Sequence, residues 1–460
     1  MEAMRPLWFQ TALLPEGWTA QVRISGAAGR ISSIERGVPP GAQDERHAIA
    51  LPGLPNLHSH AFQRGLAGLT ERRAGGPDSF WSWRELMYRF IEHMDADEFE
   101  ALCAQAYVEM LEAGFTQVGE FHYLHHERGG TPYADPGELA GRVAAAAAHT
   151  GIGLTLLPVF YAHGNFGGAA PQPRQRRFLS DPAGFARILE ASRRAVRCVP
   201  GAGVGIAPHS LRAVTPPELA AVLALGAGGP VHIHIAEQLR EVEECLSWSQ
   251  RRPIEWLLEN AAVDERWCLV HATHASAAEL QGIARHAAVV GLCPMTEASL
   301  GDGIFPAVAF AEYRGRFGIG SDSNVRVDAA EELRLLEYSQ RLAHRARNVL
   351  AGAAGASTGR SLFEAALAGG TQALRPREEG VGLCSGAALD LVSLQQEDPS
   401  LAGASGDALL DAWIFCAGHT AIDCVWRAGV KLVQNGRHRE RAAIQARYAR
   451  VLRHLVSAAA

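Results

Sequence analysis

The stretch LPGLPNLHSHAFQR, residues 51–64, carries two histidines at the end of an apolar run. His58 and His60 are separated by one residue. Because side chains alternate between the two faces of a β-strand, both imidazoles would project from the same face. Two imidazoles presented in this way supply half of a zinc site. A His-x-His pair alone is about as often two surface or core histidines as a metal site, so its interpretation depends on the rest of the chain.

The composition indicates a folded protein of ordinary polarity. The 460 residues are 48% hydrophobic and 20% charged, with a formal net charge of −6. No block of Lys and Arg stands out, which argues against a nucleic-acid partner. The most apolar stretch, 144–159, is interrupted by polar residues and glycines, so we expect no membrane span. Eight cysteines without CxxC spacing, and a start (MEAMRPLWFQ) without a signal-peptide pattern, favour a cytoplasmic protein.

Strand-like apolar runs alternate with helical patterns from residue 52 to about 375. The helical pattern at 97–111 has one apolar stripe that Gly114 can end, and another helical pattern covers 331–343. The strand-like runs are 51–57, 116–121, 153–160, 204–207, 231–235, 268–270, 289–292 and 317–320. Eight alternations predict an α/β fold, a TIM-like (β/α)₈ barrel enlarged by loop insertions.

Both ends of the chain have β character outside this region. Residues 1–50 contain short strand-like runs punctuated by glycine, and 380–460 contain further runs before a helical tail at 439–459. We expect the two ends to pair into one small β-sandwich domain that includes the tail, with 51–379 as the barrel. The Gly/Pro-rich stretch 167–177 is predicted to be a long loop over the barrel mouth.

Side chains with metal-binding or acid–base chemistry follow several of the predicted barrel strands, where active sites of this barrel gather. In chain order they are His58 and His60, His209, His232, His234 and Glu237, His271 and Asp322. One such histidine would be interpreted as structural, but the whole set indicates a mononuclear metal hydrolase. His232 and His234 share a face by simple alternation, so both remain candidate ligands at this point.

The pattern resembles the amidohydrolase superfamily, in its mononuclear deaminase branch. The shared pattern is HxH, then His-x-x-Glu after the fifth strand, His after the sixth and Asp after the eighth. A second similarity lies near the C-terminus, where GLCSGAALDLVSL is similar to the family's G-x-x-x-G-x-x-A-D-L segment, with Leu389 in place of Ala. IAPHS lacks the lysine that dinuclear members place after the fourth strand, so the resemblance implies one metal ion. The ligands that it implies are His58, His60, His234 and Asp322. Such a set suits Zn²⁺, although Fe²⁺ and Mn²⁺ also accept it.

Longer motifs narrow the resemblance to the formimidoylglutamate deiminase family. They are PNLHSHAFQRGLAG, GEFHYLHH, APHSLRAV, HIHIAEQ and CPMTEASLGDGIFP. The resemblance implies hydrolysis of N-formimino-L-glutamate to N-formyl-L-glutamate and ammonia, a step of histidine degradation, by attack of metal-bound hydroxide on the formimino carbon. It also implies a homodimer.

The same resemblance implies a role for each candidate side chain. Asp322 would be the first proton acceptor, His271 would orient the water and stabilise developing charge, and Glu237 would deliver protons to the leaving nitrogen. The implied substrate contacts are Gln63 and His209 for the formimino group, and Arg84, Tyr123 and Arg212 for the carboxylates. Arginine suits this role because its planar fork pairs with carboxylates. Taken alone, Arg84 reads as a helix-surface residue and Tyr123 as a packing aromatic.

Three alternatives remain open on the sequence alone. A deaminase of an aminoheterocycle is disfavoured by the two arginines, and a metal-free scaffold by the complete set of candidate ligands. Formimino-aspartate is a possible substrate, since one methylene changes discrimination by only about 1–3 kcal/mol. We interpret His122, His125 and His126 as loop and supporting histidines, because only one strand end contributes to them. His274 is also interpreted as structural.

Overall fold

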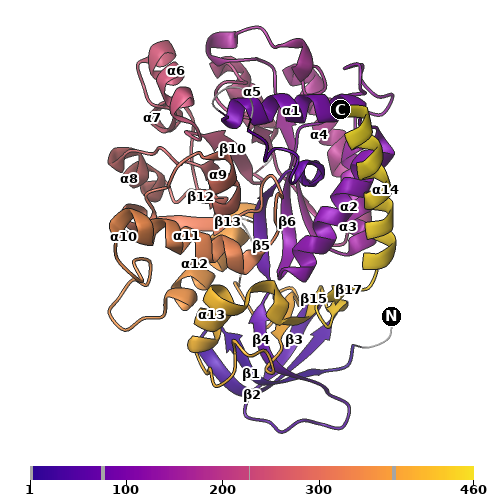
Figure 1. Ribbon diagram of the computed structural model, residues 1–460, viewed down its shortest axis with the longest axis vertical. Coiled ribbons are helices and arrows are strands. Elements are labelled where there is room, and N and C mark those ends of the chain that lie inside the picture. The colour runs from indigo at the N-terminus through magenta and orange to yellow at the C-terminus, as the bar shows by residue number, and fades with distance from the viewer. Residues whose placement is uncertain (1–3, 74–77, 227, 376–379, 460) are drawn as a thin grey trace.

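The chain was studied as a computed structural model that describes residues 4–73, 78–226, 228–375 and 380–459. A barrel of parallel strands surrounded by helices lies above a smaller β domain (Figure 1). The barrel strands are β5 (Leu54–Ser59), β6 (Phe115–His122), β7 (Gly153–Phe160), β8 (Gly203–Val204) with β9 (Ala207–Pro208), β10 (Val231–Ile235), β11 (Trp267–His271), β12 (Val289–Leu292) and β13 (Arg316–Ile319).

These strands form two parallel sheets that close into a ring. β5 to β8 are one sheet and β10 to β13 the other. Parallel bridges between Ser59 and Asp322, and between Ser210 and His234, join the sheets at both seams. The predicted α/β barrel is therefore confirmed.

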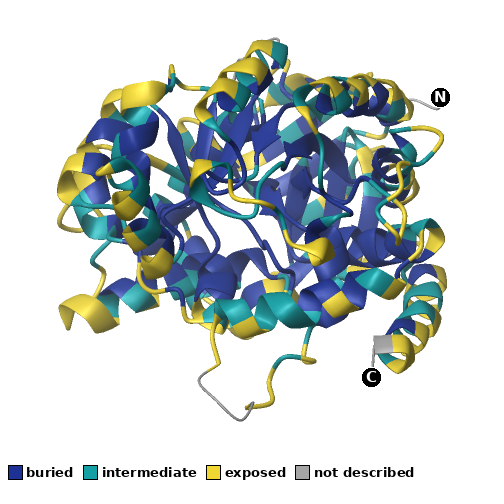
Figure 2. Cartoon of the chain, turned by 90° about the horizontal axis from the view of Figure 1, so that it is seen from above, coloured by how far each residue is buried: buried dark blue, intermediate teal, exposed yellow. Residues whose placement is uncertain are grey.

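Helices cover the outside of the barrel, with buried inner faces and exposed outer faces (Figure 2). They are α1 (Phe80–His93), α2 (Ala96–Glu112), α3 (Glu138–Thr150), α4 (Pro182–Ala195), α5 (Pro216–Leu225), α6 (Leu239–Ser249), α7 (Pro253–Asn260), α8 (Ala277–Arg285), α9 (Pro294–Leu300), α10 (Ala307–Glu312), α11 (Ala329–His344) and α12 (Thr358–Leu374). The helices expected at 97–111 and 331–343 are α2 and α11. A reciprocal capping box between Asp95 and Glu98 starts α2. No helix among the described residues combines the length and apolar character needed to cross a membrane.

The end of α12 closes the floor of the barrel. Ala373 and Leu374 pack against Leu57, Cys268 and Val289 in one buried cluster. The opposite end, where the strands terminate, remains for the functional groups.

Both chain ends contribute strands to the β domain, as predicted. Its single sheet has the order β17–β16–β15–β14–β4–β1–β2–β3. The strands are β1 (Leu7–Leu14), β2 (Gly17–Ala27), β3 (Arg30–Glu35), β4 (Glu45–Pro52), β14 (Leu391–Leu394), β15 (Ile422–Arg427), β16 (Val430–Gln434) and β17 (Arg437–His438), with the short helix α13 (Ala408–Ala412) before β15. Antiparallel pairing of β4 with β14 joins the two chain ends.

Two boundaries between the barrel and the β domain differ from those that the hydrophobic pattern alone predicts. The run expected as one strand at 51–57 is divided at Gly53, between β4 in the β domain and β5 in the barrel. A Cβ at Gly53 would lie 2.2 Å from the Thr116 side chain, so the close approach requires glycine. The helical tail, α14 (Arg441–Ala459), packs along α2 of the barrel, where Arg447 donates to Glu100 at 2.7 Å.

Candidate active site

Four side chains meet at the open end of the barrel. His58 and His60 lie at the end of β5, His234 in β10, and Asp322 just after β13. Each offers one ligand atom to a buried group in which these atoms all lie within 4.8 Å of one another. The parallel strands bring distant parts of the chain together here because their carboxyl ends share one rim.

The donor set fits a divalent metal ion. His58 Nε2 lies 3.1 Å from His234 Nε2 and 3.4 Å from Asp322 Oδ1, and His60 Nε2 is also 3.4 Å from Asp322 Oδ1. Burial lowers the pKa of all three imidazoles, that of His58 to about 3. Neutral imidazoles turned toward one carboxylate form a ligand set for a metal ion.

The backbone determines which ring nitrogens face the centre. His60 Nδ1 lies 2.9 Å from the Phe121 carbonyl, and His234 Nδ1 lies 3.1 Å from the His209 carbonyl. A carbonyl can only accept, so each Nδ1 carries the proton and each Nε2 presents its lone pair. Burial alone would raise the pKa of Asp322, but the adjacent His58 and His60 hold it below its usual range.

The ambiguity between His232 and His234 is resolved by depth in the barrel. His232 lies two residues nearer the floor, where its Nε2 bonds the Ala373 carbonyl at 2.9 Å. His274 Nε2 bonds the Asp302 carbonyl at 2.9 Å. The nearby histidines bond carbonyls as well, His125 to Val159 and His126 to Leu179, and within the described chain they belong to no candidate metal group.

Two acid–base groups flank the ligand set. His271 Nε2 lies 3.8 Å from Asp322 Oδ2 and 3.9 Å from Glu237 Oε1. Burial raises the pKa of Glu237 to about 7, against the opposing effect of His271 and Arg212. Burial would lower the pKa of His271, but Glu237, then Glu297 and Asp322, raise it to about 10. Near neutral pH a proton can therefore reside on Glu237.

Left-handed backbone conformations occur at two residues of the site. His271 and Asp322, which are not glycines, have φ values of 69° and 45°. Histidine and aspartate adopt this region several times more often than other non-glycine residues.

One cavity connects the acid–base groups with all five predicted substrate-binding residues. Gln63, Arg84, Tyr123, His209 and Arg212 line it together with Glu237, His271 and three of the four ligands, His60, His234 and Asp322. Gln63 Nε2 donates to the Tyr123 hydroxyl at 2.7 Å. The Nε atoms of Arg84 and Arg212 are buried without a hydrogen-bond partner among the described residues. The cavity thus contains two guanidiniums with unused donors.

Four polar residues that support the site were not identified from the sequence. Glu297 Oε1 lies 3.2 Å from His271 Nδ1 and accepts from the Cys293 backbone at 2.9 Å. Asn56 and Asn324 both bond Ser321, at 2.6 Å through the side chains. Residues 320–324, GSDSN, contributed only Asp322 to the predicted site, because hydrogen bonding by buried amides leaves no pattern in the sequence.

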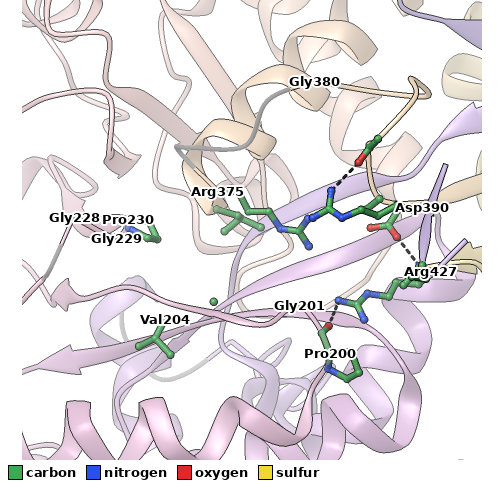
Figure 3. Close-up of a pocket in the computed structure, with 18 of the residues that line it drawn as sticks. Pro200, Gly201, Val204, Gly228, Gly229, Pro230, Arg375, Gly380, Asp390 and Arg427 are labelled. Carbon is green, nitrogen blue, oxygen red and sulfur yellow. Dashed lines mark hydrogen bonds between the residues drawn. The ribbon is translucent and has the colours of Figure 1, made fainter. Parts of the chain in front are cut away.

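A second cavity, at the other end of the barrel, is also a candidate functional site because of its size. A cavity of about 1050 Å³ lies at the junction of the barrel floor and the β domain, lined in part by Arg375, Asp390 and Arg427 (Figure 3). Its described lining contains neither histidine nor cysteine. The chemistry therefore identifies the barrel mouth as the site.

The fold and this ligand set define a metal-dependent hydrolase class. Residues 49–430 match the model of the amidohydrolase family, and the chain belongs to that family. Residues 4–48 match the model described as formimidoylglutamate deiminase HutF, N-terminal domain. Formimidoylglutamate deiminase of Pseudomonas aeruginosa is 50% identical over 438 residues, covering 95% of this chain and 96% of that protein. Within the amidohydrolases, the chain belongs with the formimidoylglutamate deiminases.

Two further comparisons agree with this placement. The crystal structure of an amidohydrolase from Brucella melitensis superposes with a TM-score of 0.95 at 54% identity, covering 98% of this chain and all of that one. An 8-oxoguanine deaminase of Pseudomonas aeruginosa is 26% identical over 66% of this chain and 67% of its own length. The expected family is confirmed, and the aminoheterocycle deaminases are the more distant relatives.

Proposed function

We propose that this chain hydrolyses N-formimino-L-glutamate to N-formyl-L-glutamate and ammonia, as its relative's name indicates for that protein. The observation that carries the proposal is a single cavity lined by Arg84 and Arg212 as well as by Glu237, His271 and three of the four ligands. An uncharged heterocycle would leave both guanidiniums without a partner, at considerable cost in a buried site. A substrate with two carboxylates supplies a partner for each.

His58, His60, His234 and Asp322 would hold the metal ion, and we propose Zn²⁺ as the ion. When bound, it would acidify a water molecule and so supply the nucleophile at neutral pH. Asp322 Oδ2 and His271 Nε2, 3.8 Å apart, would both orient that water. Asp322 would accept its proton, and His271, protonated at neutral pH, would stabilise the developing charge. The water oxygen would then bond to the formimino carbon, while the π electron pair of its C=NH bond moves to that nitrogen, which takes up a proton and becomes –NH₂.

Glu237 would move protons to the departing nitrogen. As the C–NH₂ bond breaks, its electron pair goes to nitrogen, which leaves as ammonia, and the carbon retains oxygen as a formyl group. The pKa of Glu237, raised to about 7 by burial, suits both taking and giving a proton near neutrality. Gln63 and His209 would contact the formimino group. Arg84, Tyr123 and Arg212 would hold the carboxylates.

We also propose a homodimer in the cytoplasm, following the resemblance. No disulfide joins the cysteines of the described chain, which suits a reducing compartment. Light scattering on the purified protein tests the dimer.

The decisive experiment is incubation of zinc-loaded protein with N-formimino-L-glutamate, with assays for ammonia and for the carbon product. Stoichiometric ammonia and N-formyl-L-glutamate, lost in Glu237→Gln with the metal content unchanged, would establish the reaction. Formamide with glutamate would show that the other C–N bond is cut. No turnover by metal-replete protein would reject the substrate, and N-formimino-L-aspartate in parallel tests the shorter homologue.

A further inference from the structure

A second, outer cavity adjoins the catalytic one. It measures about 170 Å³ and is lined by Trp81, Arg84, Arg212, Arg240, Glu244 and the segment 164–172. Arg84 and Arg212 line both cavities, so their side chains form the boundary between them. Arg212 is only 6% exposed, whereas the Arg240 side chain is 58% exposed. The outer cavity therefore leads from solvent to the buried Arg212 and the half-buried Arg84.

Three guanidiniums gather around one indole ring in this cavity. The Trp81 ring centroid lies 4.5 Å from Arg84 Cζ, 4.5 Å from Arg240 Cζ and 5.9 Å from Arg212 Cζ. The negative face of an aromatic ring attracts cations, and so it can hold like charges close together. The indole provides no formal negative charge, however. Glu241 and Glu237 act on Arg212 from the inner side, so the positive charge least balanced by carboxylates lies on Arg84 and Arg240, toward the outer cavity.

Glu244 is the one carboxylate among the described residues that line the outer cavity. Its Oε1 accepts from Arg240 Nε at 2.6 Å, and its Oε2 accepts from Asn165 at 3.0 Å. An exposed pair of this kind is weak. Arg240 can therefore exchange its contact with Glu244 for a carboxylate that arrives from solvent.

We propose that the outer cavity is an entry subsite for carboxylates, in which Arg240 receives a carboxylate of the substrate before Arg84 and Arg212 hold it beside the catalytic groups. The proposal rests on the proposed function for the identity of the substrate. Clustered charge in a cleft of low dielectric raises the local concentration of the opposite charge. Since N-formyl-L-glutamate keeps both carboxylates, the same route serves product exit.

The test compares charge variants in steady-state kinetics with N-formimino-L-glutamate. Arg240→Gln is expected to raise KM by about three- to tenfold, with kcat within about twofold, and to weaken the dependence of kcat/KM on salt. Arg240→Lys keeps the charge and is expected to keep KM near the wild-type value. Glu244→Gln removes the competing carboxylate and is expected to lower KM.

Arg251→Gln is the matched control. Arg251 is also exposed and paired with a glutamate four residues later, Glu255 at 3.4 Å, but it lines neither cavity. The proposal is overturned if Arg240→Gln matches this control in KM and in salt dependence, or if Arg240→Lys behaves like Arg240→Gln.

A direct binding experiment separates this proposal from the proposed function. Glutarate carries two carboxylates and no formimino group. Calorimetric titration of glutarate into the wild type, Arg240→Gln and Arg251→Gln measures the subsite even if wild-type protein does not turn over N-formimino-L-glutamate. Binding weakened at least about threefold in Arg240→Gln alone supports the subsite, and equal binding in all three proteins rejects it.

Discussion

The Asn324→Ala variant, compared with a backbone-matched control, should measure how much the hydrogen bonds of the Asn324 side chain stabilise the barrel rim. Asn324 is fully buried, and its Nδ2 donates to the Ser59 hydroxyl at 3.1 Å and to the His60 and Asp322 carbonyls at 3.1 and 2.9 Å. Its Oδ1 accepts from Ser321 at 2.6 Å. One amide therefore ties two proposed metal ligands to each other across the seam between β5 and β13.

The magnitude follows from these four contacts. At about 0.5–1.5 kcal/mol each, their loss should lower the free energy of unfolding by about 2–6 kcal/mol. Asn324 also has a φ of 54°, where alanine adds roughly 1–2 kcal/mol. Because the ligands lose a support, we also expect metal affinity to fall about 10–100-fold.

Asn435→Ala is the control, since Asn435 has a φ of 51° on an exposed turn between β16 and β17. It incurs the same backbone cost without the network. Denaturant unfolding of both variants gives the difference, and competition with a chromogenic chelator gives metal affinity. If Asn324→Ala unfolds with the same free energy as Asn435→Ala and binds metal as the wild type does, the network does not support the site.

Three further results are expected. Chelation of the metal should abolish ammonia release and lower the Tm. Restoring metal at 100 times its Kd should increase the free energy of unfolding by about 2.7 kcal/mol, measured calorimetrically. Full activity in verified metal-free protein would contradict the proposed ligand set. Arg84→Lys and Arg212→Lys should each raise KM by roughly 10–100-fold, because lysine lacks the fork that pairs with a carboxylate; unchanged KM would remove that arginine from the substrate site. The Asp328 carboxylate, 2.7 Å from His419 Nδ1, raises the pKa of His419 in the folded protein. The pair should therefore stabilise the fold fully below the unfolded pKa of about 6.5, and this stabilisation should disappear as pH rises through the raised folded pKa. The stability gap between wild type and His419→Gln should therefore be larger at pH 6 than at pH 9, and a constant gap would refute it.

The sequence predicted the elements of the barrel because local patterns determine them. Alternation in β5 places His58 and His60 on one face, and the capping box of α2 sets its start. The order of strands and helices then requires the strand ends to share one rim, which brings Asp322 to the histidines. The roles of Gln63, Arg84, Tyr123, His209 and Arg212 came from the family resemblance, and they stay predictions until their variants are measured.

Tertiary structure alone decided what depends on depth, seams and contacts between distant segments. His232 and His234 share a face in sequence, but only the position of Ala373 on the barrel floor shows which one lies beneath the site. α14 follows the β domain in the chain, yet packs on α2. Asn324, and the indole that gathers Arg84 and Arg240, act through contacts between residues far apart in sequence. Periodicity reports which face a side chain occupies, whereas hydrogen bonds and cation–π contacts depend on distances that only the folded chain defines.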